Sequence, residues 1–298
     1  MLSRCPYAPL LHALLLLFFV PRLAGACASC GCGDPTLTAM GQEKPFKNRI
    51  RLSLDERVGA HSAGKPAEQS LISRTMLSGS WSPTGWLTLG AQLPFIFVRS
   101  TAAGQEPRQA AGIGDTDLMV RALVFRDRKF SPRHALGLLA GVKAPSGPRI
   151  DDSSGYPAPD DVQPGSGSWD ALFGASYGYF AAQVSAFFSA SYRQTTPGYR
   201  GYRRGSAFAA SLAVQLPVGA RAALVLGTDL GYAQANQLAS GQAAPDTGGL
   251  LVTASPGLIF ALRTDWLLRL MVQVPVIERW RGEQHEAPTG VLSLVVDI

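Results

Sequence analysis

The stretch "LTLGAQLPFIF", Leu87 to Phe97, alternates in character from one residue to the next. Every odd-numbered position in it is apolar, whereas the even positions include Thr88, Gly90 and Gln92. A period of two is the signature of a β-strand whose two faces meet different surroundings. We therefore expect a strand here with one apolar face and one more polar face.

The same alternation recurs along the chain, for example in "DTDLMVRALVF" (115–125), "AAQVSAFFSASY" (181–192) and "DWLLRLMVQV" (265–274). Each segment is close to the ~9–11 residues that a tilted strand needs to cross a bilayer. About twelve such segments can be found. They cover residues 47–58, 69–80, 86–98, 112–125, 134–143, 168–179, 181–192, 206–216, 221–232, 249–260, 266–275 and 289–298.

Continuous apolar faces suit lipid, and the opposite, mostly small and polar faces suit a water-filled lumen. A soluble sandwich would instead bury its large apolar side chains between two sheets. In hydrocarbon an unpaired strand leaves backbone groups unsatisfied, so such a sheet must close on itself. The pattern predicts an all-β fold, a transmembrane antiparallel β-barrel of about twelve strands.

The predicted connections alternate in length. The long ones are 59–68, 99–111, 144–167, 193–205, 233–248 and 276–288, and the short ones are 81–85, 126–133, Phe180, 217–220 and 261–265. Bacterial outer-membrane barrels have long outer loops and short periplasmic turns, so this order predicts that both termini lie in the periplasm. Aromatic residues near the segment ends fit interfacial girdles: Trp81, Trp86, Trp169, Tyr179, Tyr192, Trp266 and Trp280.

The N-terminus has the features of a secretory signal. Arg4 precedes an apolar core at 10–20, which is followed by the small-x-small sequence Ala24-Gly25-Ala26. The core is too short to span a membrane, which takes ~20 residues. We expect a signal peptide over 1–26, a periplasmic head over 27–46 and the barrel over 47–298. A lipoprotein signal is the alternative, since "LAGAC" also places a cysteine behind small residues.

The composition excludes several classes of protein. The chain carries four cysteines in 298 residues, too few for a disulfide-stapled small domain. Its net charge of +6 falls to about +4 once Arg4 and Arg22 leave with the signal. That charge is small and dispersed, so a nucleic-acid partner is not expected. The expected partners are outer-membrane lipid, lipopolysaccharide and a small solute.

Cys27, Cys30 and Cys32 crowd the start of the predicted head. A disulfide or free thiol chemistry suits the oxidising periplasm. The three thiolates could also hold a soft ion such as Cu(I) or Zn(II), the one cofactor the sequence suggests. Lipidation of Cys27 is the third alternative. These alternatives remain open at the level of sequence.

Polar residues opposite the apolar faces are the candidates to line the lumen: Arg51, Gln92, Asp117, Arg121, Gln183, Asp229, Arg269 and Gln273. They could form a selective path whose charges tune what passes. They could equally pair with one another and rigidify a narrow barrel. Twelve strands leave a lumen wider than that of an ~8-strand barrel and narrower than that of a ~16-strand porin.

Two predicted loops carry charge. The acids Asp151, Asp152, Asp160 and Asp161 could bind a divalent cation or form a solvated loop. The second loop, 193–205, could meet lipopolysaccharide phosphates or be a basic surface loop; its arginines are Arg193, Arg200, Arg203 and Arg204.

The histidines left after processing, His61, His134 and His285, show no triad spacing, so we do not expect an enzyme.

Three segments resemble one known family. They are "GIGDTDLMVRALVF" (112–125), "LAGVKAPSGPRIDD" (139–152) and "GSGSWDALFGASYGY" (165–179). Their order and spacing are similar to those of the outer-membrane proteins grouped with the meta-pathway of phenol degradation, over roughly 81–192 and more loosely to the C-terminus. The cysteine head is not part of that pattern.

The resemblance implies a monomeric outer-membrane barrel in a transporter family that is often linked to uptake of aromatic or other hydrophobic compounds. The function we predict is thus an outer-membrane channel for small hydrophobic or aromatic solutes. The alternative is a barrel that anchors a periplasmic thiol or metal-binding head and presents it to a partner protein.

Overall fold

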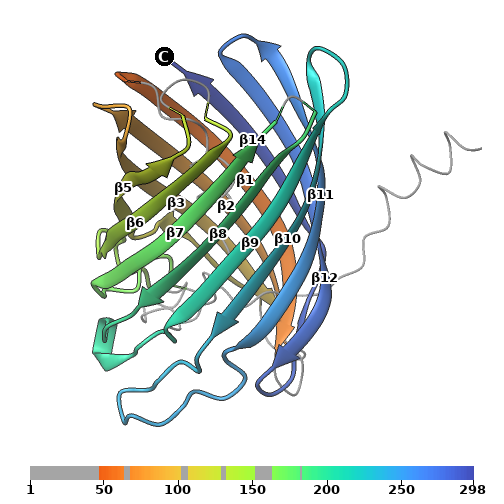
Figure 1. Ribbon diagram of the computed structural model, residues 1–298. Helices are drawn as coiled ribbons and strands as arrows, with labels where there is room; N and C mark the ends of the chain where they lie inside the picture. Colours follow the sequence, from red (N-terminus) through yellow and green to blue (C-terminus); the bar gives the residue numbers. More distant parts are fainter. Residues whose placement is uncertain (1–46, 64–67, 102–106, 129–131, 152–162, 182) are drawn as a thin grey trace, which may run out of the picture.

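A computed structural model describes residues 47–63, 68–101, 107–128, 132–151, 163–181 and 183–298. The described chain forms one antiparallel β-sheet that curls into a barrel (Figure 1). Its strands are β1 (Arg49–Ala63), β2 (Glu68–Ser82), β3 (Leu87–Thr101), β4 (Arg108–Ile113), β5 (Thr116–Arg126), β6 (His134–Ala144), β7 (Asp170–Phe180), β8 (Ser185–Gln194), β9 (Ala207–Pro217), β10 (Ala222–Ala233), β11 (Gly249–Arg263), β12 (Trp266–Trp280), β13 (Gln284–Glu286) and β14 (Thr289–Asp297). A single 3-10 turn, η1 (Tyr199–Gly201), lies between β8 and β9 in the described part of the chain.

The sheet closes because β1 pairs with β2 on one side and with β14 on the other. Two positions of the wall are each filled by an interrupted strand. β3 pairs with β5 along its first half and with β4 along its second half, and β1 pairs likewise with β14 and β13. The fourteen strands therefore make a ring of twelve positions, which confirms the predicted barrel and its strand number.

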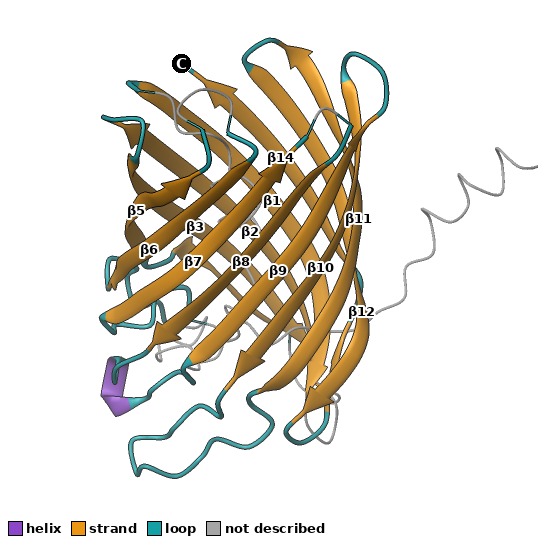
Figure 2. Cartoon of the chain, in the orientation of Figure 1, coloured by secondary structure: helices purple, strands orange, loops and turns teal. Residues whose placement is uncertain are grey.

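The apolar–polar alternation in the sequence corresponds to an alternation of exposed and buried side chains along the barrel strands. On β5, Leu118 and Val120 are 48% and 45% exposed, whereas Met119 between them is only 8% exposed. On β3, Phe95 is exposed and Ile96 is buried. Successive side chains of a strand point to opposite faces, so the exposed set forms the outside of the barrel and the buried set faces its interior. Figure 2 shows the strands as a continuous tilted wall.

The two ends of the barrel differ (Figure 1). The C-terminus and the described residues of the short connections lie at one end, which we name the short-turn end: 83–86, 127–128, 132–133, 181, 183–184, 218–221 and 264–265. The described residues of the longer connections lie at the other, the long-loop end: 145–151, 163–169, 195–206 and 234–248. Three predicted long loops, 59–68, 99–111 and 276–288, are largely taken up by strand instead. The single-residue connection predicted at Phe180 is also wrong, because β8 begins only at Ser185.

Most predicted girdle residues are exposed. Trp81, Trp86 and Trp266 are exposed near the short-turn end, and Trp169 and Tyr192 near the long-loop end. Trp280 is different, because its ring packs edge-on against His61, with 6.1 Å between the ring centroids. The girdle prediction is therefore wrong for Trp280.

The interior is less polar than predicted. One buried apolar cluster lies in the long-loop half of the barrel and consists of Ile96, Val98 and Ala110, with Ile72 and Ile150 packed on it. A second lies in the short-turn half and consists of Val225, Met271 and Val291, with Ala213 and Ile259 packed on it. The inner wall thus combines apolar patches with buried polar groups.

The predicted signal peptide (1–26) and the predicted head (27–46), with all the cysteines, lie outside the described residues. Their assignments stay predictions. Within the described ranges, no helix is long and apolar enough to cross a membrane.

Candidate functional site

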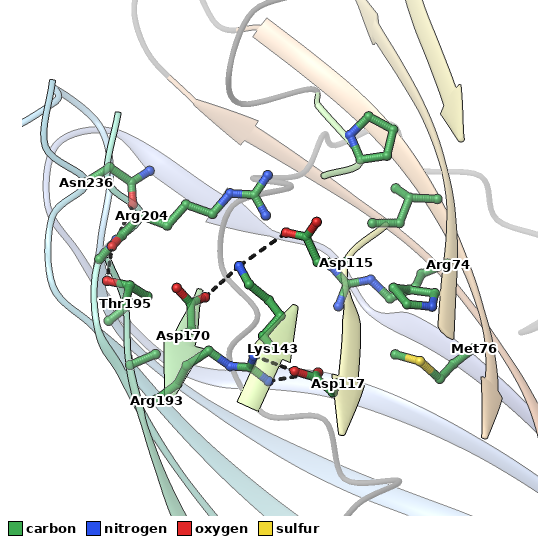
Figure 3. Close-up of a pocket in the computed structure, with 16 residues that line it drawn as sticks. Arg74, Met76, Asp115, Asp117, Lys143, Asp170, Arg193, Thr195, Arg204 and Asn236 are labelled. Atoms are coloured by element: carbon green, nitrogen blue, oxygen red, sulfur yellow. Dashed lines mark hydrogen bonds and ion pairs between the residues drawn. The ribbon is translucent and has the colours of Figure 1, made fainter. Parts of the chain in front are cut away.

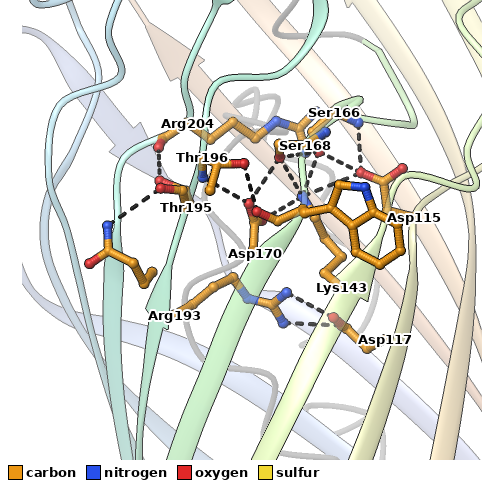
Figure 4. Close-up of polar contacts among 12 residues, drawn as sticks. Asp115, Asp117, Lys143, Ser166, Ser168, Asp170, Arg193, Thr195, Thr196 and Arg204 are labelled. Atoms are coloured by element: carbon orange, nitrogen blue, oxygen red, sulfur yellow. Dashed lines mark hydrogen bonds and ion pairs between the residues drawn. The ribbon is translucent and has the colours of Figure 1, made fainter.

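A buried cluster of charges lies where β5, β6 and β7 approach the long-loop end. Lys143, near the end of β6, is the cross-strand partner of Asp170, the first residue of β7. Asp115 lies in the break between β4 and β5. These three residues are only 8%, 2% and 7% exposed. Figure 4 shows them converging with Ser166 and Ser168, and we call these five residues the Lys143 network.

Lys143 holds both carboxylates. Its Nζ lies 2.5 Å from Asp170 Oδ2 and 3.3 Å from Asp115 Oδ2, and it donates to the hydroxyls of Ser166 and Ser168. One ammonium cannot neutralise two carboxylates, so the rest of the negative charge is met by hydrogen bonds. A buried ion cluster is tolerated only when its remaining polar atoms find such partners.

The additional donors come from the loops. Asp115 accepts the N–H groups of Gly147 (3.1 Å) and Ser166 (2.8 Å). Asp170 accepts the Ser168 hydroxyl (2.9 Å) and the Thr196 N–H (3.2 Å). The network therefore ties the two described ends of the β6–β7 connection, and the start of the β8–β9 loop, to the barrel wall.

Glycines permit this close packing. A Cβ on Gly147 would lie 2.7 Å from the Cα of Gly165, and one on Gly165 would lie 2.5 Å from the carbonyl oxygen of Gly147. The Tyr199 hydroxyl of η1 donates to that same carbonyl at 2.9 Å. Only glycine leaves room for two backbones to meet at this distance.

A second ion pair lies beside the network. Arg193 of β8 donates two hydrogen bonds to Asp117 of β5, at 2.8 and 3.0 Å. A two-pronged arginine–carboxylate pair is both stronger and more directional than a single contact. Arg193 was predicted to lie on a loop that could meet lipopolysaccharide or form a basic surface, but it is the penultimate residue of β8 and pairs with Asp117 in the interior.

The other arginines of that loop also differ in placement. Arg204 donates to the carbonyl oxygen of Gln163 at 3.0 Å and lines the interior. Arg203 lies 3.4 Å from the Thr195 hydroxyl, and Arg200 is exposed. Of the four, only Arg200 is placed as the prediction of a basic surface loop requires.

These residues surround a cavity of about 100 Å³ at the mouth of the lumen. Met76, Pro94 and Ile96 of β2 and β3 contribute an apolar wall. Pro164, Gly205, Ala207 and Ala233 also line the cavity. The charged and polar lining residues are Arg74, Asp115, Asp117, Lys143, Asp170, Arg193, Thr195, Arg204 and Asn236. Figure 3 shows Met76 and Arg74 on one side of the cavity, and Thr195 and Asn236 on the other.

Four predicted lumen-lining residues lie deeper in the barrel, buried and bonded to one another or to neighbours. Asp229 accepts the Ser255 hydroxyl at 2.5 Å and the Gln273 amide at 3.2 Å. Arg269 Nη2 lies 3.7 Å from Asp55 Oδ1. Arg51 Nε bonds Asp297 at 2.7 Å. These contacts favour the alternative in which the polar groups pair and rigidify the wall.

Gln92, Arg121 and Gln183 were also predicted to line the lumen. Gln92 is buried on the inner face of β3, and Arg121 shares the inner face of β5 with Met119. Gln183 is exposed in the turn before β8. The prediction that Gln183 lines the lumen is therefore wrong, because the alternating pattern begins before the strand does.

Each of the three histidines contacts one acidic or tyrosine side chain. His61 bonds Glu286 at 3.0 Å, His285 bonds Glu278 at 2.7 Å and His134 bonds the Tyr177 hydroxyl at 2.6 Å. In the part of the chain that the structure describes, no group of three His, Cys, Asp or Glu residues could hold a metal ion. The cysteines and three of the four loop acids, Asp152, Asp160 and Asp161, lie outside those residues.

Lys143, Asp170 and Asp115 were missed as site residues, although all three lie in the segments that carry the family resemblance. A lysine at the end of an apolar strand and an aspartate at the start of the next strand were the available signal. The sequence separation of 27 residues hid their pairing, which only the register of β6 against β7 reveals.

A closed antiparallel barrel with an apolar outer face is an outer-membrane β-barrel. A family model described as "Putative MetA-pathway of phenol degradation" matches residues 70–283, and the chain belongs to this family. The family expected from the three sequence segments is thus confirmed. A comparison with curated proteins finds no match.

Solved structures share the fold. An outer-membrane channel from Pseudomonas putida F1 matches with a TM-score of 0.66 and 15% identity, over 86% of this chain and 98% of that one. The translocator domain of the autotransporter NalP from Neisseria meningitidis matches with a TM-score of 0.51 and 10% identity, over 88% of this chain and 92% of that one. The β domain of a Bordetella autotransporter matches with a TM-score of 0.51 and 11% identity, over 85% of this chain and 100% of that one. These matches confirm the barrel fold.

Proposed function

We propose that this protein is an outer-membrane channel through which small hydrophobic or aromatic solutes pass. The long-loop end faces the outside of the cell, and both termini lie in the periplasm. The family description, which refers to phenol degradation, supports the solute class. The similar Pseudomonas putida structure is described as an outer-membrane channel, which supports the activity. Short turns at the end with the C-terminus support the orientation.

The observation that carries the solute class is the apolar inner wall. Ile96 and Val98 are buried on the inner face near the mouth, and Val225 and Met271 are buried on it nearer the short-turn end. Apolar side chains in a lumen gain nothing from contact with water. An apolar solute that packs against them gains roughly 25 cal/mol for each Å² of its own apolar surface that leaves water. The wall therefore favours hydrophobic solutes over sugars or ions.

Single-channel recording in planar bilayers tests this proposal. Benzyl alcohol should interrupt the ion current of the wild-type protein, whereas glucose at the same concentration should not. Ile96→Ser should shorten the interruptions because it removes apolar contact at the mouth. Folded protein that forms no conducting pore, or that responds equally to glucose, would refute the proposal.

The alternative function depends on residues 27–46, which lie outside the described residues. A head that presents thiols or a soft metal to a partner stays a prediction, as do contacts with lipopolysaccharide and the monomeric state.

A further inference from the structure

The mouth cavity has two chemically different sides. Met76, Pro94 and Ile96 supply apolar surface on one side, where Arg74 also lies. The other side is formed by the charged members of the Lys143 network, by the Arg193–Asp117 pair and by Arg204. A solute that fits both sides would be amphipathic.

Not every cation around the cavity is paired with a carboxylate. Lys143 is matched by Asp115 and Asp170, and Arg193 is matched by Asp117. Arg204 donates to a neutral carbonyl, that of Gln163, and no carboxylate among the described residues lies within ion-pair distance of it. Figure 3 shows its side chain reaching from the β8–β9 loop into the cavity. Arg204 therefore presents to the mouth a guanidinium without an anionic partner in the described part of the chain. With Arg74, the lining as a whole carries four cations and three carboxylates.

We propose that this cavity binds small amphipathic monocarboxylates, with the carboxylate on Arg204 and the apolar body on Met76, Pro94 and Ile96. The inference rests on the proposed channel function and narrows its substrate class. A guanidinium can offer a carboxylate two parallel N–H groups. Partial burial strengthens that contact because the surroundings screen charge less than water does.

The same geometry disfavours two other kinds of solute. A neutral aromatic alcohol can use the apolar wall but leaves Arg204 without an anion. A dicarboxylate would add a second negative charge to a lining of four cations (Arg74, Lys143, Arg193 and Arg204) and three carboxylates (Asp115, Asp117 and Asp170), which one carboxylate already balances. The site should therefore rank a monocarboxylate above both.

Current interruption in planar bilayers provides the test, with benzoate, benzyl alcohol and phthalate as probes of similar size. Benzoate should interrupt the current at a concentration about tenfold lower than either of the others, because a charge-assisted pair adds to the apolar contact. Arg204→Gln should abolish that advantage and leave the response to benzyl alcohol unchanged. Arg204→Lys should retain part of it.

Arg200→Gln is the matched control, because Arg200 lies in the same loop but is exposed. It removes the same charge and should leave the benzoate response as it is in the wild type. The inference is overturned if Arg204→Gln and the wild type bind benzoate equally, or if phthalate binds as tightly as benzoate. In either case an unchanged response to benzyl alcohol would show that the channel function still stands. Failure of all three probes would instead count against both.

Discussion

At the scale of single residues, Lys143 determines how two acids can be buried side by side. Asp115 and Asp170 are each less than 10% exposed, and both contact the same ammonium. Removing water from a carboxylate is costly unless a cation and hydrogen-bond donors replace it. Without Lys143 the two acids would repel each other in surroundings that screen charge poorly. Lys143 should therefore contribute strongly to the stability of the mouth.

Lys143→Met should lower the free energy of unfolding by about 3–5 kcal/mol, because it leaves buried carboxylates without their cation. Urea titration in lipid vesicles measures this. The matched control is Arg128→Met, which removes an exposed pair, with 3.7 Å between Arg128 Nε and Asp127 Oδ2. Exposed pairs contribute about 0–1 kcal/mol, so the control should change little.

A further variant separates charge from packing. Lys143→Met combined with Asp115→Asn and Asp170→Asn removes the cation together with both charges. It should recover much of the lost stability, since the remaining groups are neutral and keep hydrogen-bonding capacity. If the triple variant is no more stable than the single one, the loss comes from packing and the electrostatic explanation is wrong.

At the scale of the elements, the break between β4 and β5 lets the β6–β7 connection reach the inside of the wall. Gly114 keeps a hydrogen bond from its N–H to the carbonyl of Pro94 at 2.7 Å, so β3 stays paired across the break. Gly147 and Gly165 then pack against each other and against this point. The loop is fixed by backbone contact as well as by charge.

Gly165→Ala should loosen this connection, because the added methyl would lie 2.5 Å from the Gly147 carbonyl oxygen and backbone cannot move aside as a side chain can. Hydrogen exchange should become faster at Gly147 and Ser166. Gly90→Ala is the control, since its nearest contact would be an ordinary 3.6 Å. Equal exchange in the two variants would show that the glycine contact does not hold the loop.

The sequence predicts the strands well where lipid demands an apolar face, as at Leu118 and Val120. It predicts their ends poorly, as at Ala63 and Trp280, because a strand that continues beyond the lipid no longer has to alternate. The prediction for Gln183 is wrong for the opposite reason. The sequence alternates there, yet the chain forms a turn in which the Ala181 N–H donates to the Val184 carbonyl. The Lys143 network could not be predicted, because its contacts depend on register and on loops that fold inward.

At the scale of the whole molecule, the two faces of the wall should respond differently to charge. Val120→Arg places a cation on the outer face, where Val120 is 45% exposed, and should cost about 2–4 kcal/mol if it lies near the bilayer midplane. Gln92→Arg should cost much less, because Gln92 faces inward and is the cross-strand neighbour of Asp117. Unfolding titrations in vesicles compare the two, and equal costs would contradict the assigned faces.

The seam between β1 and β14 has a consequence for how the chain folds. Arg51 and Asp297 meet across it although 246 residues separate them in sequence. Bringing such distant segments together costs more chain entropy than forming any of the neighbouring hairpins, so this contact should form late. Until then, both strands expose an unpaired edge that can recruit another chain. The risk of aggregation during folding is therefore greatest before the first and last strands pair. A mutation at the seam would prolong that period even if the finished barrel were equally stable.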